Sequence, residues 1–312
     1  EEAERVCHRA WTIDAQSPVV QYALGSLYAE SGQTEKARDA FTSSLEINPG
    51  ALNAQIAIAE TYHEDDPGLA ENLLKRIIEQ HPGSPNAYMS LQYLYWKQGR
   101  YAEAVDTMKW VMRLLPNDEG VKFRLSSTMI LAGQFAEAKD LLIPLVENDA
   151  VDLASINSNL ATILFFEHDF SAAAELYLDA IEKEPEDPVY YRNLGDATWH
   201  LDGPGVADPI FQEAIRLAKR QLAINPDDSY ALSSVMVSAA SIGDMEAYQK
   251  ARQKMIDSWG SDPQTQYDFA IAASRLGEMG VAQEHARNAY DLGYPVALLR
   301  ADPDISATGV TF

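Results

Sequence analysis

The side chains that most often perform catalysis or bind metal ions are few and scattered in this sequence. It has one cysteine, Cys7, and six histidines, at positions 8, 63, 81, 168, 200 and 285. No two histidines have the i,i+4 spacing of a zinc-binding helix, and no GxSxG, Walker or GxGxxG motif is present. The sequence therefore predicts no enzyme activity, no cofactor and no metal site.

Two short segments could do chemistry but have simpler interpretations. His63 is followed by Glu64, Asp65 and Asp66, a group that could bind a cation but fits a solvated turn better. The segment LDGPGVADP at 201–209 contains two glycines. It lacks the preceding strand that positions a phosphate-binding loop, so we interpret it as a turn between helices.

The composition limits the kinds of partner. The 312 residues include 24 Lys and Arg against 47 Asp and Glu, which gives a net charge of −23. Binding to duplex nucleic acid needs a clustered positive field, so this fragment is not expected to bind it. No apolar run approaches the ~20 residues that span a bilayer, so we expect no membrane insertion by it. The acidity fits solubility of an elongated surface, and the alternative is attraction to a basic partner.

The segment QYALGSLYAESGQTEKARDAFTSSLEINP, residues 21–49, is the pattern on which the chain is built. Leu24, Gly25 and Tyr28 share one face of a predicted helix, and Ala37 and Phe41 share the facing stripe of a second. A glycine turn separates the two helices, and a proline ends the second. Small residues facing each other allow the helices to approach closely.

This pattern resembles the tetratricopeptide repeat, whose period is about 34 residues. The resemblance covers nearly the whole chain and implies an all-α fold. The expected architecture is a right-handed superhelical solenoid of antiparallel helix pairs, with about eight repeats and an N-terminal half-repeat. Because residues 1–16 match the second half of a repeat, we expect the sequence to be a fragment of a longer protein.

The recurrence of the pattern predicts the organisation of the chain. After the half-repeat at 1–16, five repeats occupy 17–187, an extended sixth repeat 188–228, two degenerate repeats 229–296 and a C-terminal cap or tail 297–312. The sixth repeat has seven extra residues, which we expect to be shared between its two helices, the second running from about 209 to 224. The tail is expected to add one short helix.

The long sixth repeat, NPDD at 225–228 and the ending LGYPVALLRADPDI also resemble a narrower group. These are C-terminal repeat arrays of bacterial signalling proteins, which follow serine/threonine kinase, adenylate cyclase or winged-helix domains. The last residues, ISATGVTF, depart from that group's usual ending. The resemblance implies either a cytoplasmic protein or the extracytoplasmic part of a membrane-anchored one, and the sequence does not decide between them.

The resemblance also implies where a partner would bind, because the first helices of such repeats line a groove. Seven residues on that side combine aromatic anchors, amides that can hold a peptide backbone, and cations. They are Tyr93, Trp96, Lys97, Asn159, Arg192, Asn193 and Trp199. The same face is expected to include Asp196, His200, Tyr267, Ser274 and Arg275. For each aromatic, packing between neighbouring helices is the alternative interpretation.

We therefore expect a non-catalytic scaffold that binds a segment of another protein, as the docking or sensory arm of a larger signalling protein. The alternative is a structural assembly module that associates with itself through its ends.

Overall fold

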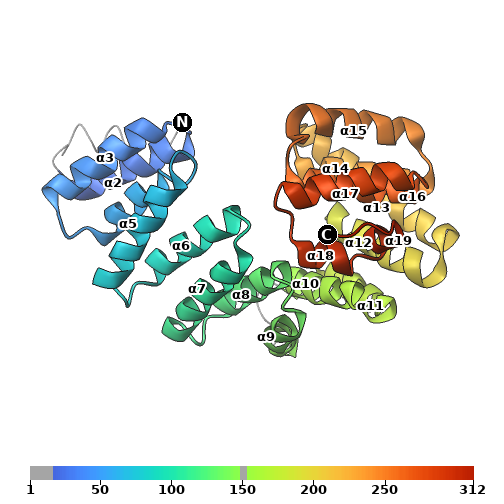
Figure 1. The fold of residues 1–312 in the computed structure, drawn as a ribbon, viewed down its shortest axis with the longest axis horizontal. Coiled ribbons are helices and arrows are strands. Elements are labelled where there is room, and N and C mark those ends of the chain that lie inside the picture. The colour runs from blue at the N-terminus through green and yellow to red at the C-terminus, as the bar shows by residue number, and fades with distance from the viewer. Residues whose placement is uncertain (1–16, 148–152) are drawn as a thin grey trace. The chain divides into compact units, whose positions relative to one another are not determined.

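The computed structural model describes residues 17–147 and 153–312, so the predicted half-repeat at 1–16 lies outside the described residues. Every regular element in these ranges is a helix, and the helices follow one another in pairs (Figure 1). Eight pairs are described, which confirms the predicted all-α fold of helix pairs. None of these helices is long and apolar enough to cross a bilayer.

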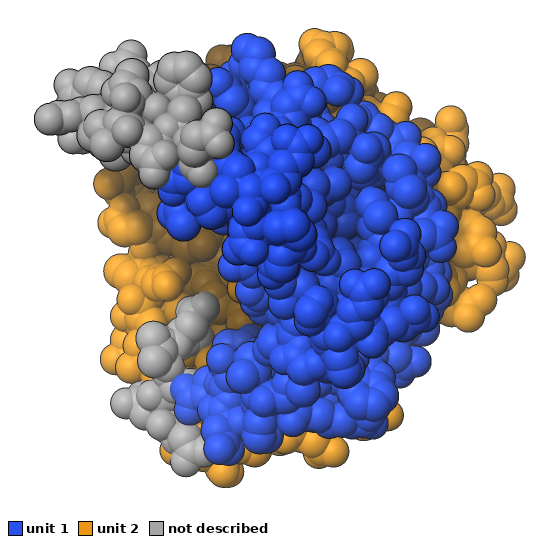
Figure 2. Space-filling model, turned by 90° about the vertical axis from the view of Figure 1, so that its left-hand side faces the viewer, with its two compact units in different colours: residues 1–121 blue, residues 122–312 orange. Residues whose placement is uncertain are grey.

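The chain divides into two compact units, residues 1–121 and 122–312 (Figure 2). Unit 1 contains three pairs, which are α2 (Pro18–Glu30) with α3 (Thr34–Ile47), α4 (Leu52–Glu60) with α5 (Pro67–Gln80), and α6 (Pro85–Lys97) with α7 (Tyr101–Leu114). Helix α8 (Glu119–Leu131) begins at the end of unit 1 and lies mostly in unit 2.

Unit 2 continues with four complete pairs after α8 and its partner α9 (Phe135–Glu147). They are α10 (Leu153–Phe166) with α11 (Phe170–Lys183), α12 (Pro188–Asp202) with α13 (Pro204–Ile224), α14 (Ser229–Ile242) with α15 (Met245–Trp259), and α16 (Pro263–Arg275) with α17 (Met279–Asp291). Two short helices, α18 (Val296–Ala301) and α19 (Pro303–Ala307), end the chain. We call these two helices the C-terminal cap.

Local sequence explains where many of the helices begin. Aspartates precede several of them and accept a hydrogen bond from a first-turn N–H, as Asp169 does from Ala172 and Asp244 does from Ala247. Such capping satisfies a backbone donor that has no partner inside the helix. Proline occupies the first turn of α12 and α16, where its missing N–H costs nothing.

The close approach of paired helices depends on glycine. A Cβ added to Gly25 would lie 2.5 Å from the ring of Phe41, and one added to Gly195 would lie 2.5 Å from the ring of Phe211. Each phenylalanine lies on the second helix of the pair whose first helix carries the glycine. The predicted contact of small and aromatic residues in the first repeat is therefore present, and it recurs in the sixth.

Two sequence expectations were wrong in detail. The extra residues of the sixth repeat lie almost entirely in α13, which begins at Pro204 and has 21 residues, against 14 in α11 and 15 in α15. Gly203 ends α12 so sharply, with φ of 92°, that the new helix starts at once with Pro204. The tail forms two short helices where one was expected, because Asp302 and Pro303 start a second helix.

Candidate functional site: the first helices of the repeats

We define the inner face of each unit as the surface formed by the first helices of its pairs. Tyr93, Trp96 and Lys97 lie on the inner face of unit 1, and Asn159, Arg192, Asn193 and Trp199 lie on that of unit 2. The seven predicted residues therefore form two sets, and each set is described within its own unit.

The inner face of unit 1 carries an exposed pair of aromatic rings. Tyr93 and Trp96 are one helical turn apart on α6, and 47% and 41% of their surfaces are exposed. Their rings stack, with centroids 5.9 Å apart and planes 21° apart. Large apolar side chains left open in this way are able to bury area against a partner.

His63 and Lys97 border this aromatic pair. The His63 ring lies 5.8 Å from that of Tyr93, and the Lys97 ammonium lies 5.9 Å from the Tyr93 centroid. Lys97 also forms an ion pair with Glu64 from the turn after α4. Burial of His63, together with the charge of Lys97, lowers the pKa of the imidazole, which is therefore neutral at pH 7.

An ion-pair network behind this face fixes α5, α6 and α7 to one another. Glu71 accepts hydrogen bonds from Arg100 at 2.6 Å, from Lys75 at 2.6 Å and from the Tyr95 hydroxyl at 3.1 Å. The Arg100 guanidinium is the main reason that the pKa of Glu71 falls to about 2. These charges are satisfied within unit 1, so they position α6 and are not free to bind a partner.

The predicted residues of unit 2 are bonded inside the unit. Asn159 donates from its amide nitrogen to Ser127 at 2.8 Å. Arg192 donates to the Ser233 hydroxyl at 2.9 Å and to the side-chain oxygen of Asn193 at 3.3 Å. The Arg275 guanidinium lies 4.4 Å from the ring centroid of Trp199, a cation–π contact.

The C-terminal cap covers part of the same face. The Asp304 carboxylate accepts two hydrogen bonds from Arg275, from Nε at 2.9 Å and from Nη2 at 2.7 Å. It also lies 3.2 Å from His200 Nε2. Asp302 accepts a hydrogen bond of 2.6 Å from the Tyr267 hydroxyl. His200, Tyr267 and Arg275 were expected to face an open groove, and they face the C-terminal cap instead.

Further contacts of the cap reach the turns of earlier repeats. His168 Nε2 lies 3.2 Å from the Ala301 carbonyl oxygen, and a Cβ on Gly133 would lie 2.5 Å from that of Ala297. Leu299 and Ile305 are completely buried. Hydrogen bonds join α19 to α12 and α16, and Figure 1 shows the cap in this part of unit 2. The cap is thus packed as part of the core of unit 2.

Burial of so many charges changes their titration. Burial raises the pKa of Asp302 to about 7, and the charge of Asp304 adds to this effect. Burial alone would also raise the pKa of Asp304, but Arg275 and His200 outweigh it and hold that pKa below the usual value. Asp304 is therefore the ionised partner of Arg275. Asp302 is the carboxyl of the two that the folded protein more readily holds in its protonated form.

Sequence reasoning did not identify Asp302 and Asp304 as important residues. The segment Asp302-Pro303-Asp304 has the composition of a helix start, and the apolar residues Leu298, Leu299 and Ile305 around it indicate a buried helix. Those sequence features could have predicted that the C-terminal cap packs against the preceding helices. Within the described ranges, no group of three or more His, Cys, Asp or Glu side chains could hold a metal ion.

The helix pairs and their inner faces define a class of repeat protein, and comparison with known proteins agrees. Models of the tetratricopeptide repeat match residues 19–50, 56–118, 95–158 and 158–229. The chain therefore belongs to the tetratricopeptide repeat family.

Among curated proteins, the chain is similar to TPR repeat-containing protein YpiA of Bacillus subtilis, with 24% identity over 69% of this chain and 59% of that protein. It is 23% identical to the peroxisomal targeting signal receptor of Debaryomyces hansenii, over 56% of this chain and 30% of the receptor. It is also 23% identical to human protein O-mannosyl-transferase TMTC1, over 62% of this chain. The chain spans 22% of that transferase's length, and less than two thirds of each of the three.

Solved structures show the same fold. A tetratricopeptide repeat protein from Parabacteroides merdae has a TM-score of 0.57 at 10% identity, covering 94% of this chain and 99% of its own. PilW, a widely conserved type IV pilus biogenesis factor, has a TM-score of 0.51 at 13% identity, covering 70% of this chain and 97% of its own.

Proposed function

We propose that this protein is a non-catalytic scaffold that binds a segment of another protein through the inner faces of its repeats. The observation that carries the proposal is the exposed, stacked pair of Tyr93 and Trp96 on the inner face of unit 1. Rigid aromatic side chains that become fully desolvated supply most of the energy of many interfaces, often about 2 kcal/mol or more each. The family and the names of two relatives, a targeting-signal receptor and a pilus biogenesis factor, fit a protein that acts through binding.

We assign Tyr93, Trp96 and Lys97 direct contact with the partner. Lys97 is 38% exposed and already paired with Glu64, so it can exchange that carboxylate for one of the partner at little cost. We assign Asn159, Arg192, Asn193 and Trp199 a supporting role, because their polar atoms or rings are engaged within unit 2. Their contacts join the first helices of unit 2 to one another.

The test is capture of partners with matched tryptophan variants. Trp96 and Trp110 are similarly exposed, at 41% and 50%, but Trp110 lies on α7, the second helix of the same pair. A protein captured by the wild-type chain should be lost with Trp96→Ala and retained with Trp110→Ala. Loss with Trp110→Ala and retention with Trp96→Ala would place the binding surface on the second helices and contradict the proposal.

We further propose that the chain serves as the docking or sensory arm of a bacterial signalling protein, and that its partner is basic. The basis is the excess of 47 acidic over 24 basic residues, together with the ending that resembles such arrays. Attraction between exposed charges is screened by salt. The affinity for the captured protein should therefore fall as the ionic strength is raised, and an affinity unaffected by salt would argue against a basic partner.

The alternative is an assembly module that associates with itself through its ends. It predicts a molar mass that increases with protein concentration in light scattering after size exclusion. A constant monomeric mass over a hundredfold range of concentration would remove this alternative.

A further inference from the structure

A second surface with binding character lies in unit 2, on the side of the second helices. A cavity of about 590 Å³ lies among α13, α14 and α15. Its apolar lining includes Leu222, Leu232, Val235, Ala247 and Ala251. Leu232 and Val235 are each only 4% exposed, so they belong to the core, and the cavity opens directly onto it. The volume is within the ~300–1,000 Å³ range of pockets that hold small molecules.

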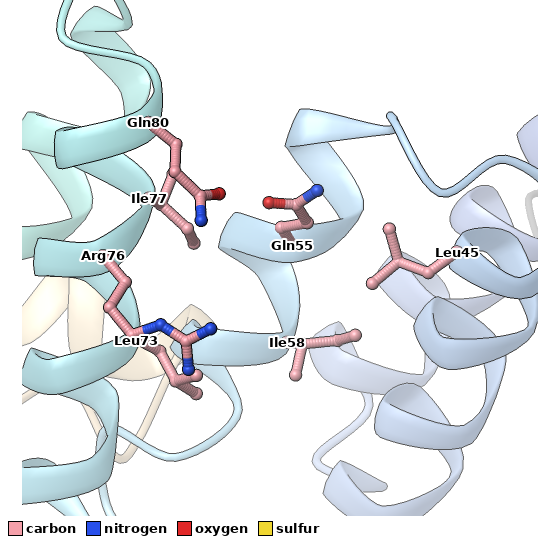
Figure 3. A pocket seen from close by; sticks show the side chains of 7 residues that line it. All are labelled: Leu45, Gln55, Ile58, Leu73, Arg76, Ile77 and Gln80. Carbon is pink, nitrogen blue, oxygen red and sulfur yellow. The ribbon is translucent and has the colours of Figure 1, made fainter.

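An equivalent groove in unit 1 shows what distinguishes this one. It lies among α3, α4 and α5, in the corresponding place of the first two pairs, and has a volume of only about 160 Å³ (Figure 3). Its lining consists of leucine, isoleucine, glutamine and arginine side chains, without an alanine. Three alanines line the cavity of unit 2, and their small side chains leave space there.

In a chain of net charge −23, the larger cavity is lined by three lysines against two acidic residues. Lys219 of α13 and Lys250 and Lys254 of α15 line it. Lys254 is paired with Asp227 at 3.1 Å. Among the described residues, Lys219 and Lys250 have no carboxylate within ion-pair distance, although many other cations in these ranges do.

Two acidic residues also line the cavity, and neither forms an ion pair with Lys219 or Lys250. Asp244 caps α15 by accepting a hydrogen bond of 3.1 Å from the backbone N–H of Ala247. Glu246 is exposed on the rim. Lys219 and Lys250, from two different helices, therefore line a largely apolar pocket without forming an ion pair with any described residue, an arrangement that favours a ligand with one negative charge and an apolar body.

We propose that this cavity binds a small amphiphilic carboxylate. Its head group lies between Lys219 and Lys250, and its apolar chain lies along Leu222, Leu232 and Val235. The site is separate from the inner face of unit 1, so it does not depend on the proposed partner-binding function. Burial of the ligand's apolar chain supplies the affinity, and the two lysines favour an anionic amphiphile over a neutral or cationic one.

Isothermal titration of the full chain with decanoate, below the concentration at which it forms micelles, tests the proposal. We expect saturable binding with one site per chain. Decyltrimethylammonium has a similar chain and the opposite charge, and butyrate has the head group without the long chain. Both should bind at least tenfold more weakly. Equal binding of decyltrimethylammonium would overturn the proposal.

Variants locate the site. The double variant Lys219→Met and Lys250→Met keeps the apolar stems and should weaken decanoate binding at least tenfold. Lys183→Met is the matched control, because Lys183 is an exposed lysine on α11, outside the cavity. Ala247→Leu should also weaken binding, by filling space among the lining residues. Unchanged affinity in the folded double variant, or an equal loss in the control, would contradict the assignment.

Discussion

Arg275 and Asp304 are 29 residues apart in the sequence, and their side chains meet through two parallel hydrogen bonds of 2.9 and 2.7 Å. The side chain of Arg275 is 1% exposed, and Asp196 lies 3.1 Å from its guanidinium on the other side. This guanidinium therefore connects α12, α16 and the C-terminal cap. A buried charge of this kind is costly to leave without its partner.

Removing the Asp304 carboxylate should consequently destabilise unit 2. We expect Asp304→Ala to lower the free energy of unfolding by about 3–5 kcal/mol, because Arg275 loses its main counter-charge in a buried site. Asp227→Ala is the control, since it breaks the exposed pair with Lys254 and should cost ~1 kcal/mol or less. Urea unfolding followed by tryptophan fluorescence measures both. Equal effects would mean that the cap contributes no more than a surface ion pair.

Asp302 gives the cap a dependence on pH. Its pKa is raised by burial to about 7 in the folded protein. A raised pKa means that the folded state prefers the protonated carboxyl, so stability falls as pH rises from about 4 to 7. Asp302→Asn cannot ionise, and we expect it to be stabilising relative to wild type at pH 8 but not at pH 4.

Melting temperatures at several pH values check this expectation. Asp262→Asn changes another aspartate that caps a helix of unit 2 and serves as the control. A difference between Asp302→Asn and wild type that does not change with pH would show that Asp302 is not the titrating group.

Glu71 should show the opposite dependence. Hydrogen bonds from Arg100 are the main cause of its pKa of about 2, so its contribution to stability is present above about pH 4.5 and lost as pH falls toward 2. We expect Glu71→Gln to lower the stability of unit 1 by about 1–2 kcal/mol at pH 7 and to have little effect at pH 2. Glu79→Gln, on the same helix, should have no effect at either pH. Denaturant unfolding at the two pH values distinguishes these outcomes.

The contacts of Gly25 and Gly195 predict a sharp response to a single methyl group. Gly25→Ala and Gly195→Ala should each destabilise by about 1–3 kcal/mol, because the new Cβ would meet a phenylalanine ring at 2.5 Å. Gly280→Ala should be neutral or stabilising, since nothing lies within 4 Å of a Cβ there and alanine favours the helix. If all three variants melt alike, the two glycines are not required for close packing.

The sequence predicts the helix pairs of this protein well, because each pair is specified by residues that are close in the chain. Within one repeat, Gly25 packs against Phe41. Within another, Asp169 accepts a hydrogen bond from Ala172. Helical periodicity also places Tyr93 and Trp96 on one face of α6, but it leaves open whether they pack against a neighbouring helix.

The state of the inner face in unit 2 does not follow from local pattern. Arg275 and His200 were expected on an open face, and only the fold brings Asp304 to them from 29 and 104 residues away. The sequence pattern within one repeat does not specify a contact over that distance. An inner face that is covered by the cap can therefore have the same local sequence as one that is open.

The contact between His168 and Ala301 spans 133 residues and changes how unit 2 is expected to unfold. In a simple repeat array each helix pair contacts only the neighbouring pairs, so the pairs at the two ends can unfold one at a time. Here the last two helices are held by the turn after α10, by α12 and by α16, and the terminal pair cannot separate without breaking contacts in the middle of unit 2. We therefore expect amides in α16 and α12 to exchange hydrogen in a single cooperative event, as they would in a closed globular domain.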